Sequence, residues 1–321
     1  MTTDFLLLLI GLILLLGGGD LLVRGATALA RRLGISPLVV GLTVVSFGTS
    51  TPELAVNLTA ALRGSGGLSF GNVIGSNLAN IGLIVGLTAL WRPLDVQRIV
   101  VRRELPMMLL ATTFAFVFAL DSVLSGDASS RYDRGDGIAL LLLLSVFLYY
   151  TTVDVFRQRE SGRSKARLVR RGWSVPVSLA VATTGLVVLV VGAHFTVEGA
   201  VGIARAAGIS EAVIGLTLIA VGTSLPELVT SLVAAWRGQA AIAIGNVIGS
   251  NVLNLLLVLG TTAAIRPIPV PAGGVTDLAV LSLLSLLLWR VCATRDRRII
   301  RAEGAFLLTL YVAYLSVRAL L

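Results

Sequence analysis

Ten long apolar stretches follow one another along this 321-residue chain and leave little room for any other architecture. Each approaches or exceeds the roughly 20 residues that an α-helix needs to cross a bilayer. Only 13% of the residues are charged, against about 25% in soluble globular domains. The sequence therefore predicts an all-α integral membrane protein. Its ten predicted transmembrane helices lie at residues 5–30, 37–62, 69–90, 105–121, 137–156, 173–204, 212–236, 241–264, 274–293 and 304–320.

The placement of basic residues predicts how the chain crosses the membrane. The odd-numbered loops, with the helix ends beside them, carry 20 of the 26 Lys and Arg residues. The positive-inside rule then places these loops in the cytoplasm and both termini outside. The basic runs are interpreted as topology signals and contacts for anionic lipid, so the net charge of +9 does not indicate nucleic-acid binding. No obligatory protein partner is evident.

The chain repeats itself at an offset of 174 residues. "GTSTPEL" at 48–54 matches "GTSLPEL" at 222–228, and "GNVIGSN" at 71–77 recurs letter for letter at 245–251. Each half holds five predicted helices, an odd number, so the second half enters the membrane from the opposite side. Such inverted repeats are typical of secondary transporters, whose site lies at the midplane between the halves. The predicted organisation is repeat 1–156 with motif 48–80, basic cytoplasmic linker 157–171, and repeat 172–321 with motif 222–254.

Each "GTSxPE" segment is expected to interrupt its helix. Pro52 and Pro226 lack the N–H that would pair with the carbonyl four residues earlier. At membrane depth, freed polar groups must be satisfied by protein, by water in a cavity, or by a bound cation. A simple proline kink is the alternative, but two matched copies favour a site. The carbonyl and hydroxyl oxygens expected to point to one spot belong to Thr49, Ser50, Thr223 and Ser224.

Glu53 and Glu227 are the last residues of the two "GTSxPE" segments. An acidic side chain at the centre of a membrane costs about 2.5–3.5 kcal/mol on insertion scales and usually marks an ion or proton pathway. The pseudo-twofold axis of an inverted repeat is expected to bring the two carboxylates together, and their repulsion calls for a cation. Carboxylate, carbonyl and hydroxyl oxygens suit Ca²⁺ better than zinc or copper.

The second motif is expected to supply the remaining polar wall. Its polar residues recur every fourth position and therefore share a helix face. The motif glycines, Gly71 and Gly75 with Gly245 and Gly249, are predicted to allow close helix packing. Interhelical packing is the alternative for the polar face as well. That face consists of Asn72, Ser76 and Asn80 in the first copy and Asn246, Ser250 and Asn254 in the second, whereas Asn77 and Asn251 lie off it and are expected to brace the fold.

Other polar residues offer little chemistry. Cys292 is the only cysteine, which excludes an internal disulfide and a multi-cysteine metal site. His194 is the only histidine, so the sequence offers no second histidine for a histidine-based proton relay. Asp20 and Arg24 are predicted to form an i,i+4 ion pair. An intramembrane enzyme would need a nucleophile–base set or a catalytic metal, so no enzymatic activity and no cofactor are expected.

With these motifs in hand, the chain resembles the calcium:cation antiporter family on its sodium/calcium exchanger side, in particular the compact prokaryotic exchangers of ten helices. The resemblance covers nearly the whole chain. It implies that Glu53 and Glu227 ligate Ca²⁺ together with backbone oxygens of Thr49 and Thr223. It further implies flanking Na⁺ sites, with Asn80 and Asn254 beside the central position. The Na⁺ set is Ser46, Thr49, Ser50, Glu53, Ser76, Asn80, Ala220, Thr223, Ser224, Glu227, Ser250 and Asn254, with Asn72 and Asn246 as helix-face support.

One departure from the family pattern bears on the coupling ion. Some relatives carry aspartate at one of the last two positions, whereas this chain has Asn80 and Asn254. The resemblance implies Ca²⁺/Na⁺ antiport by alternating access, with transport becoming electrogenic if three Na⁺ replace one Ca²⁺. A Ca²⁺/H⁺ antiporter using the same glutamate pair is the alternative, and a cation channel is a weaker one. The Arg-rich, Lys-poor composition favours a bacterial plasma membrane.

The lengths of two predicted helices suggest how such a transporter would move. The first and sixth spans are unusually long. We expect them to slide across a rigid core formed by the second, third, seventh and eighth helices.

Overall fold

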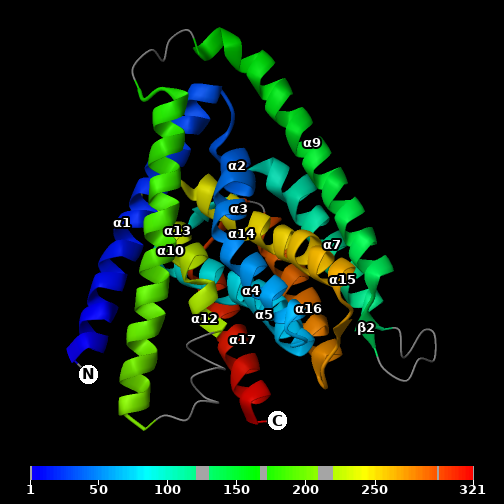
Figure 1. Ribbon diagram of the computed structural model, residues 1–321. Coiled ribbons are helices and arrows are strands. Elements are labelled where there is room, and N and C mark those ends of the chain that lie inside the picture. Colours follow the sequence, from blue (N-terminus) through cyan, green and yellow to red (C-terminus); the bar gives the residue numbers. More distant parts are fainter. Residues whose placement is uncertain (1, 121–129, 167–171, 209–219, 295, 321) are drawn as a thin grey trace. The chain divides into compact units, whose positions relative to one another are not determined.

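The computed structural model describes residues 2–120, 130–166, 172–208, 220–294 and 296–320, and these are almost entirely helical (Figure 1). The first repeat contains α1 (Thr2–Leu33), α2 (Pro37–Val40), η1 (Gly41–Val45), α3 (Ser46–Thr49), α4 (Thr51–Leu62), α5 (Gly66–Ala79), η2 (Asn80–Val85), α6 (Gly86–Trp91), η3 (Val100–Glu104), α7 (Leu105–Phe118) and α9 (Arg134–Ala166). The second contains α10 (Val175–Ala206), α12 (Ala220–Thr223), α13 (Leu225–Trp236), α14 (Ala240–Leu253), η5 (Asn254–Leu259), α15 (Gly260–Ile265), α16 (Gly274–Cys292) and α17 (Arg301–Leu320). The elements labelled η are π-helical.

Helices long and apolar enough to cross a membrane dominate the described residues. Six qualify by length and composition, and a seventh does if α2–α3 and α4, which are broken at Ser50, count as one span. Each of the ten predicted spans coincides at least in part with helix, although residues 212–219 of the seventh lie outside the described residues. The helical fold is therefore as predicted, and the number ten stays a prediction.

The 174-residue offset of the sequence reappears in the bounds of the helices. Thus α4 and α13 differ by 174 at both ends, and so do α5 and α14. The two π-helical segments η2 and η5 begin at Asn80 and Asn254, again 174 apart. Because helix ends and π-turns are set by local sequence and packing together, equivalent sequence has adopted equivalent local structure in both halves.

Four two-residue strands were not expected from an all-helical prediction. β1 (Leu94–Asp95) pairs antiparallel with β4 (Arg298–Ile299), and β2 (Arg131–Tyr132) pairs antiparallel with β3 (Ile268–Pro269). Strands β1 and β3 each follow an Arg-Pro dipeptide. Proline disfavours helical conformation in the residue before it, so the chain leaves the helix extended and its backbone finds a partner strand.

The chain forms two compact units that do not coincide with the two sequence repeats. The first unit comprises Met1–Thr49 and Asp154–Asn246, and the second comprises Ser50–Val153 and Val247–Leu321. Each unit therefore draws helices from both repeats. The assignment of 1–156 and 172–321 as inverted repeats around the linker 157–171 stays a prediction, and residues 167–171 of that linker lie outside the described residues.

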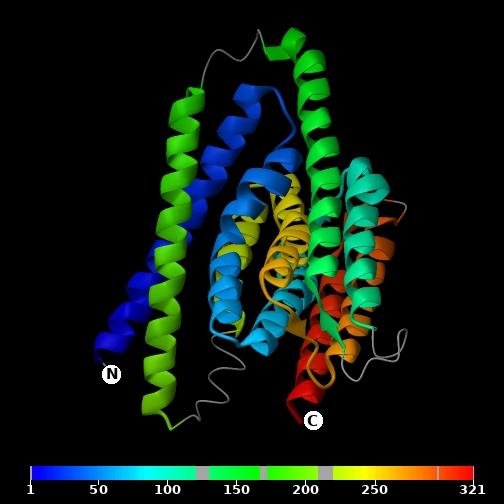
Figure 2. The ribbon, with the colours of Figure 1, turned by 45° about the vertical axis from the view of Figure 1, so that its right-hand side comes forward.

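In the first unit, α1 and α10 run antiparallel beside each other (Figures 1 and 2). Their contact is made by glycines: a Cβ at Gly18 would collide with the backbone of Leu189, and one at Gly192 with the backbone of Leu15. Small residues let helix backbones approach closely within a membrane. The glycines recur every seventh residue on both helices, at Gly11, Gly18 and Gly25 and at Gly185, Gly192 and Gly199.

In the second unit, α17 packs against η2 and α6, where Gly82 contacts Tyr311 and Gly86 contacts the backbone of Gly304. Helix α16 packs against α7. The indole of Trp289 at the end of α16 donates to the carbonyl of Val101 over 3.1 Å. These contacts hold the long helices around the short elements that carry the polar motifs.

Candidate functional site

Both "GTSxPE" segments interrupt a helix at their serine. Helix α3 ends at Thr49 and α4 begins after Ser50, whose φ and ψ are −85° and 1°. Helix α12 ends at Thr223 and α13 begins after Ser224, at −90° and 3°. Proline lies at the second position of each new helix, where its missing N–H costs nothing. The chain thus breaks twice in the same way, inside an apolar span.

In the first unit, Glu227 lies one turn into α13 and is only 1% exposed. Ser224 at the break is 2% exposed. Asn246 of α14 secures this region, because its Nδ2 donates to the carbonyl of Glu227 over 3.3 Å and to the hydroxyl of Ser231 over 3.1 Å. The backbone that carries the second glutamate is therefore held by a buried amide from the second motif.

The same asparagine reaches the first repeat. Thr49 Oγ1 donates to Asn246 Oδ1 over 3.1 Å, and it also approaches the carbonyl of Ser46 at 3.3 Å. Ser46 in turn donates its hydroxyl to the carbonyl of Leu42 over 2.7 Å. Within this unit, the "GTSTPE" segment of one half is bonded to the "GNVIGSN" segment of the other.

In the second unit, Glu53 lies one turn into α4 and is 1% exposed. Asn57, one turn farther on, donates its side chain to the carbonyl of Glu53 over 2.7 Å. Ser69 at the start of α5 donates to the carbonyl of Asn57 over 3.2 Å. Ser50 at the break is 3% exposed. Glu53 thus also lies in the buried first turn of a helix, and its carbonyl is held by a side-chain hydrogen bond.

The asparagines of the second motif lie where regular helix gives way to π-helix. Asn80 opens η2 and Asn254 opens η5. Such π-segments occur frequently at functional sites, because they displace side chains and free backbone groups. Asn80 Nδ2 donates to Asn251 Oδ1 over 3.1 Å, and Asn251 Nδ2 contacts Met108 Sδ at 3.5 Å. Asn77 donates to the carbonyl of Val73 within its own helix.

Several buried polar atoms of the candidate set have no hydrogen-bond partner among the described residues. In native proteins the great majority of buried polar side-chain atoms are paired, and an unpaired one costs about 1–3 kcal/mol. Atoms left in this state are therefore suited to bind something other than protein. They are Ser76 Oγ, Asn80 Oδ1, Ser250 Oγ and both side-chain polar atoms of Asn254 in the second unit, and Ser224 Oγ in the first.

The chemistry of these atoms indicates which ligand they suit. The described residues contain no group of three or more His, Cys, Asp or Glu side chains that could hold a metal. Hydroxyl and amide oxygens are hard ligands of the kind that Ca²⁺ and similar cations prefer. Each unit also contains the buried glutamate of one "GTSxPE" segment, Glu227 in the first and Glu53 in the second.

Comparison with known proteins places the chain in a family. The model of the sodium/calcium exchanger protein family matches residues 3–153 and 177–320. This chain belongs to the sodium/calcium exchanger family. The exchanger is 33% identical over 348 residues to the sodium/calcium exchanger MaX1 of Methanosarcina acetivorans, covering 98% of each chain. It is 39% identical over 318 residues to the inner membrane protein YrbG of Escherichia coli, covering 97% of this chain and 95% of the relative.

Solved structures agree with the sequence comparison. The exchanger matches the sodium-calcium exchanger NCX_Mj with a TM-score of 0.83 and 35% identity, covering 98% of this chain and 97% of the other. The exchanger is therefore a multi-pass membrane protein and a cation antiporter of the kind that handles Ca²⁺. The family is one of transporters rather than enzymes, and the ions of its name are cargo.

The predicted site residues of the exchanger differ in burial and in packing. Ala220 opens α12, but its side chain lies outside the described residues. Asn72 is half-buried, and Thr223 is also less buried than its counterpart Thr49. Close packing at the motif glycines is confirmed for Gly245, where a Cβ would lie 2.7 Å from the carbonyl oxygen of Leu38. At Gly71 and Gly75 the expected close packing is not found among the described residues, because a Cβ there would have no atom within 4 Å.

Asp20 of the exchanger forms one ion pair that the sequence predicts and one that it does not. The predicted pair between Arg24 Nε and Asp20 Oδ2 is present at 2.8 Å. The structure adds Arg237, which also pairs with Asp20. The two arginines lie 213 residues apart in the chain. The only sequence signal for Arg237 is the 174-residue offset, which aligns it with Arg63 at the end of the equivalent helix α4.

Proposed function

We propose that the exchanger binds one Ca²⁺ with Glu53 and Glu227, together with backbone oxygens of Thr49 and Thr223, and exchanges it for Na⁺. What carries the proposal is the recurrence of a buried glutamate at one position of both repeats, in a chain of the sodium/calcium exchanger family. A divalent ion would neutralise both carboxylates, which would otherwise repel each other in a dry environment.

Na⁺ is proposed to take the flanking oxygens. The unpaired buried atoms at Ser76, Ser250, Asn80 and Asn254 support this assignment, since each supplies an oxygen without a protein donor among the described residues. The proposed Na⁺ ligands are Ser46, Thr49, Ser50, Glu53, Ser76, Asn80, Ala220, Thr223, Ser224, Glu227, Ser250 and Asn254.

The proposed architecture is that of ten transmembrane helices in two inverted repeats, with both termini outside the cell and the site near the midplane. The long helices α1 and α10 are proposed to slide across a rigid core formed by the second, third, seventh and eighth predicted helices, which opens one set of sites alternately to each side. Ca²⁺ or Na⁺ must neutralise the glutamates before the site moves. If three Na⁺ replace one Ca²⁺, each cycle carries one net charge, worth about 2.3 kcal/mol per 100 mV.

Uptake of ⁴⁵Ca²⁺ into proteoliposomes tests the proposal. Vesicles loaded with Na⁺ are compared with vesicles loaded with K⁺ and with acid-loaded vesicles. The double variant Glu53→Gln/Glu227→Gln runs beside the wild type. Glu198→Gln serves as the matched control, because the side chain of Glu198 is 57% exposed and lies outside the proposed site.

The expected result is uptake driven only by the outward Na⁺ gradient, lost in the double variant and retained in the control. Uptake driven by the pH gradient alone would instead establish the Ca²⁺/H⁺ alternative at the same carboxylates. Full uptake in the double variant would contradict the site itself.

A further inference from the structure

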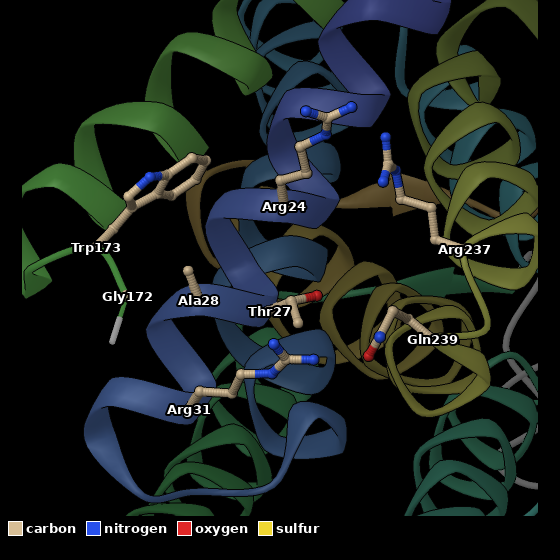
Figure 3. Close-up of a pocket in the computed structure, with 8 residues that line it drawn as sticks. All are labelled: Arg24, Thr27, Ala28, Arg31, Gly172, Trp173, Arg237 and Gln239. Atoms are coloured by element: carbon tan, nitrogen blue, oxygen red, sulfur yellow. The ribbon is translucent and has the colours of Figure 1, made fainter. Parts of the chain in front are cut away.

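The first unit contains a cavity of about 520 Å³ whose lining includes none of the residues proposed to bind Ca²⁺ or Na⁺. It lies where four chain segments end or begin: the last turns of α1, the residues before α10, the end of α13 and the residue before α14 (Figure 3). It therefore lies at one end of this unit's helices. Its main lining residues are Arg24, Thr27, Arg31, Trp173, Arg237 and Gln239.

The charge of this cavity is positive. Three of its lining residues are arginines, and the adjacent Asp20 pairs with both Arg24 and Arg237. Arg31 has no ion-pair partner among the described residues. The three guanidinium groups are thus accompanied by one paired carboxylate, which leaves about two positive charges for a ligand to balance.

Polar groups near Arg31 suit an anion with several acceptor oxygens. The hydroxyl of Thr27 is buried and has no hydrogen-bond partner in the described part of the chain. In Figure 3 this hydroxyl, the guanidinium of Arg31 and the side-chain amide of Gln239 point toward the same space. Hydroxyl, amide and guanidinium donors that converge in this way match the oxygens of a phosphate group, for which arginine is the preferred partner.

The position of the cavity favours lipid as the source of the phosphate. Trp173 lines it with 41% of its surface exposed, and exposed tryptophans at helix ends are typical of the membrane–water interface. In the topology proposed above, the segments that form the cavity lie at or beside the first, fifth and seventh loops, all cytoplasmic. The cytoplasmic leaflet holds the anionic lipids.

We propose that this cavity binds the phosphate group of an anionic ligand, with Arg31 as its principal ionic contact and Thr27 and Gln239 as hydrogen-bonding partners. The assignment of the phosphate to a lipid headgroup rests on the proposed topology. The phosphate site itself rests on the cavity and does not depend on which ion drives transport.

Thermal unfolding of the full chain in an uncharged detergent tests this. The protein is titrated with short-chain phosphatidylglycerol, with phosphatidylcholine of the same chain length and with inorganic phosphate, each at constant ionic strength. Variant Arg31→Gln is compared with Arg32→Gln, which removes the same charge from the neighbouring exposed residue outside the cavity. Thr27→Val removes the buried hydroxyl at similar volume.

We expect phosphatidylglycerol to raise the melting temperature of the wild type and phosphatidylcholine to leave it unchanged. The half-saturating concentration should rise at least about tenfold in Arg31→Gln, several-fold in Thr27→Val and less than about twofold in Arg32→Gln. An equal response to inorganic phosphate would support the site and identify free phosphate as the source. No response to either anion, or equal losses in Arg31→Gln and Arg32→Gln, would overturn the proposal. Melting is measured without ion gradients. The outcome of this test therefore does not depend on the outcome of the exchange assay.

Discussion

Thr49 donates its hydroxyl to Asn246 across 197 positions of the chain, over 3.1 Å. This bond joins the broken helix of the first repeat to the second motif of the other repeat. Asn246 also holds the carbonyl of Glu227. The backbone beside one proposed cation ligand is therefore mechanically connected to another, Thr49, through a single buried amide.

Replacing Asn246 with alanine tests this connection. The change leaves Thr49 Oγ1, the carbonyl of Glu227 and Ser231 Oγ without their amide partner. We expect a loss of about 2–4 kcal/mol in stability, since each buried unsatisfied group costs about 1–3 kcal/mol, together with a higher Ca²⁺ concentration for half-maximal uptake. Asn77→Ala is the control, because Asn77 bonds within its own helix. Equal melting temperatures and uptake in the two variants would contradict the role given to Asn246.

Asn254→Leu separates stability from ion binding. Asn254 is buried and neither polar atom of its side chain has a partner among the described residues. In choline buffer without Na⁺ or Ca²⁺, we expect leucine to raise stability by about 1 kcal/mol, because an unsatisfied group is removed.

The same variant should lose the extra stability that Na⁺ confers on the wild type by binding the folded state. The comparison is Asn251→Leu, which leaves Asn80 Nδ2 without its acceptor and should destabilise the protein. Retention of the full Na⁺-dependent rise by Asn254→Leu would remove this residue from the ion site.

Adjacent glycines of α1 are expected to respond oppositely to alanine. A Cβ at Gly18 would meet the backbone of Leu189, whereas one at Gly17 has no atom within 4 Å. Gly18→Ala should therefore destabilise the protein by about 1–3 kcal/mol through overpacking. Gly17→Ala should be neutral or slightly stabilising, because alanine favours helix. The melting temperatures of the two purified variants test this difference. Equal melting temperatures would argue against direct backbone contact between α1 and α10.

Cross-linking α1 to α13 tests the proposed sliding movement. A Cβ at Gly19 would lie 3.1 Å from Cγ1 of Val229, so cysteines at these two positions can form a disulfide in a Cys292→Ser background. Oxidation is expected to abolish ⁴⁵Ca²⁺ uptake while leaving equilibrium Ca²⁺ binding unchanged, and reduction should restore uptake. Undiminished uptake by the fully cross-linked protein would exclude movement of α1 along α13.

The Asp20 ion pairs should contribute modestly to stability. Asp20 is 24% exposed and bonds both Arg24 and Arg237, so Asp20→Asn is expected to cost about 1 kcal/mol, less at high choline chloride. Asp95→Asn is the control: Asp95 is 84% exposed in its 3.5 Å pair with Arg298, and no measurable change is expected. Melting temperatures over a series of salt concentrations provide the test, and equal, salt-independent values for both variants would contradict it.

Much of this arrangement could be read from the sequence because it is local. The breaks at Ser50 and Ser224 follow from a proline placed two residues later, and the ion pair of Asp20 with Arg24 follows from helical spacing. The family followed from duplicated motifs at one offset. These inferences need only neighbours in the chain and a repeat that is visible by alignment.

What escaped prediction depends on distant packing. No local pattern indicates that Asn80 donates to Asn251, or that regular helix changes to π-helix at Asn80 and Asn254. The strand pairs join segments that the helical pattern treats only as loops. The glycines of α1 and α10 did leave a signal, since each lies 174 residues from its counterpart at a spacing of seven.

That glycine contact has a consequence for how transport is organised. At their glycines the backbones of α1 and α10 are in direct contact, with no side chain between them. They form one tightly packed helix pair, with one helix contributed by each repeat. In the proposed sliding movement the two helices would therefore move together, so that a displacement of either one involves both repeats.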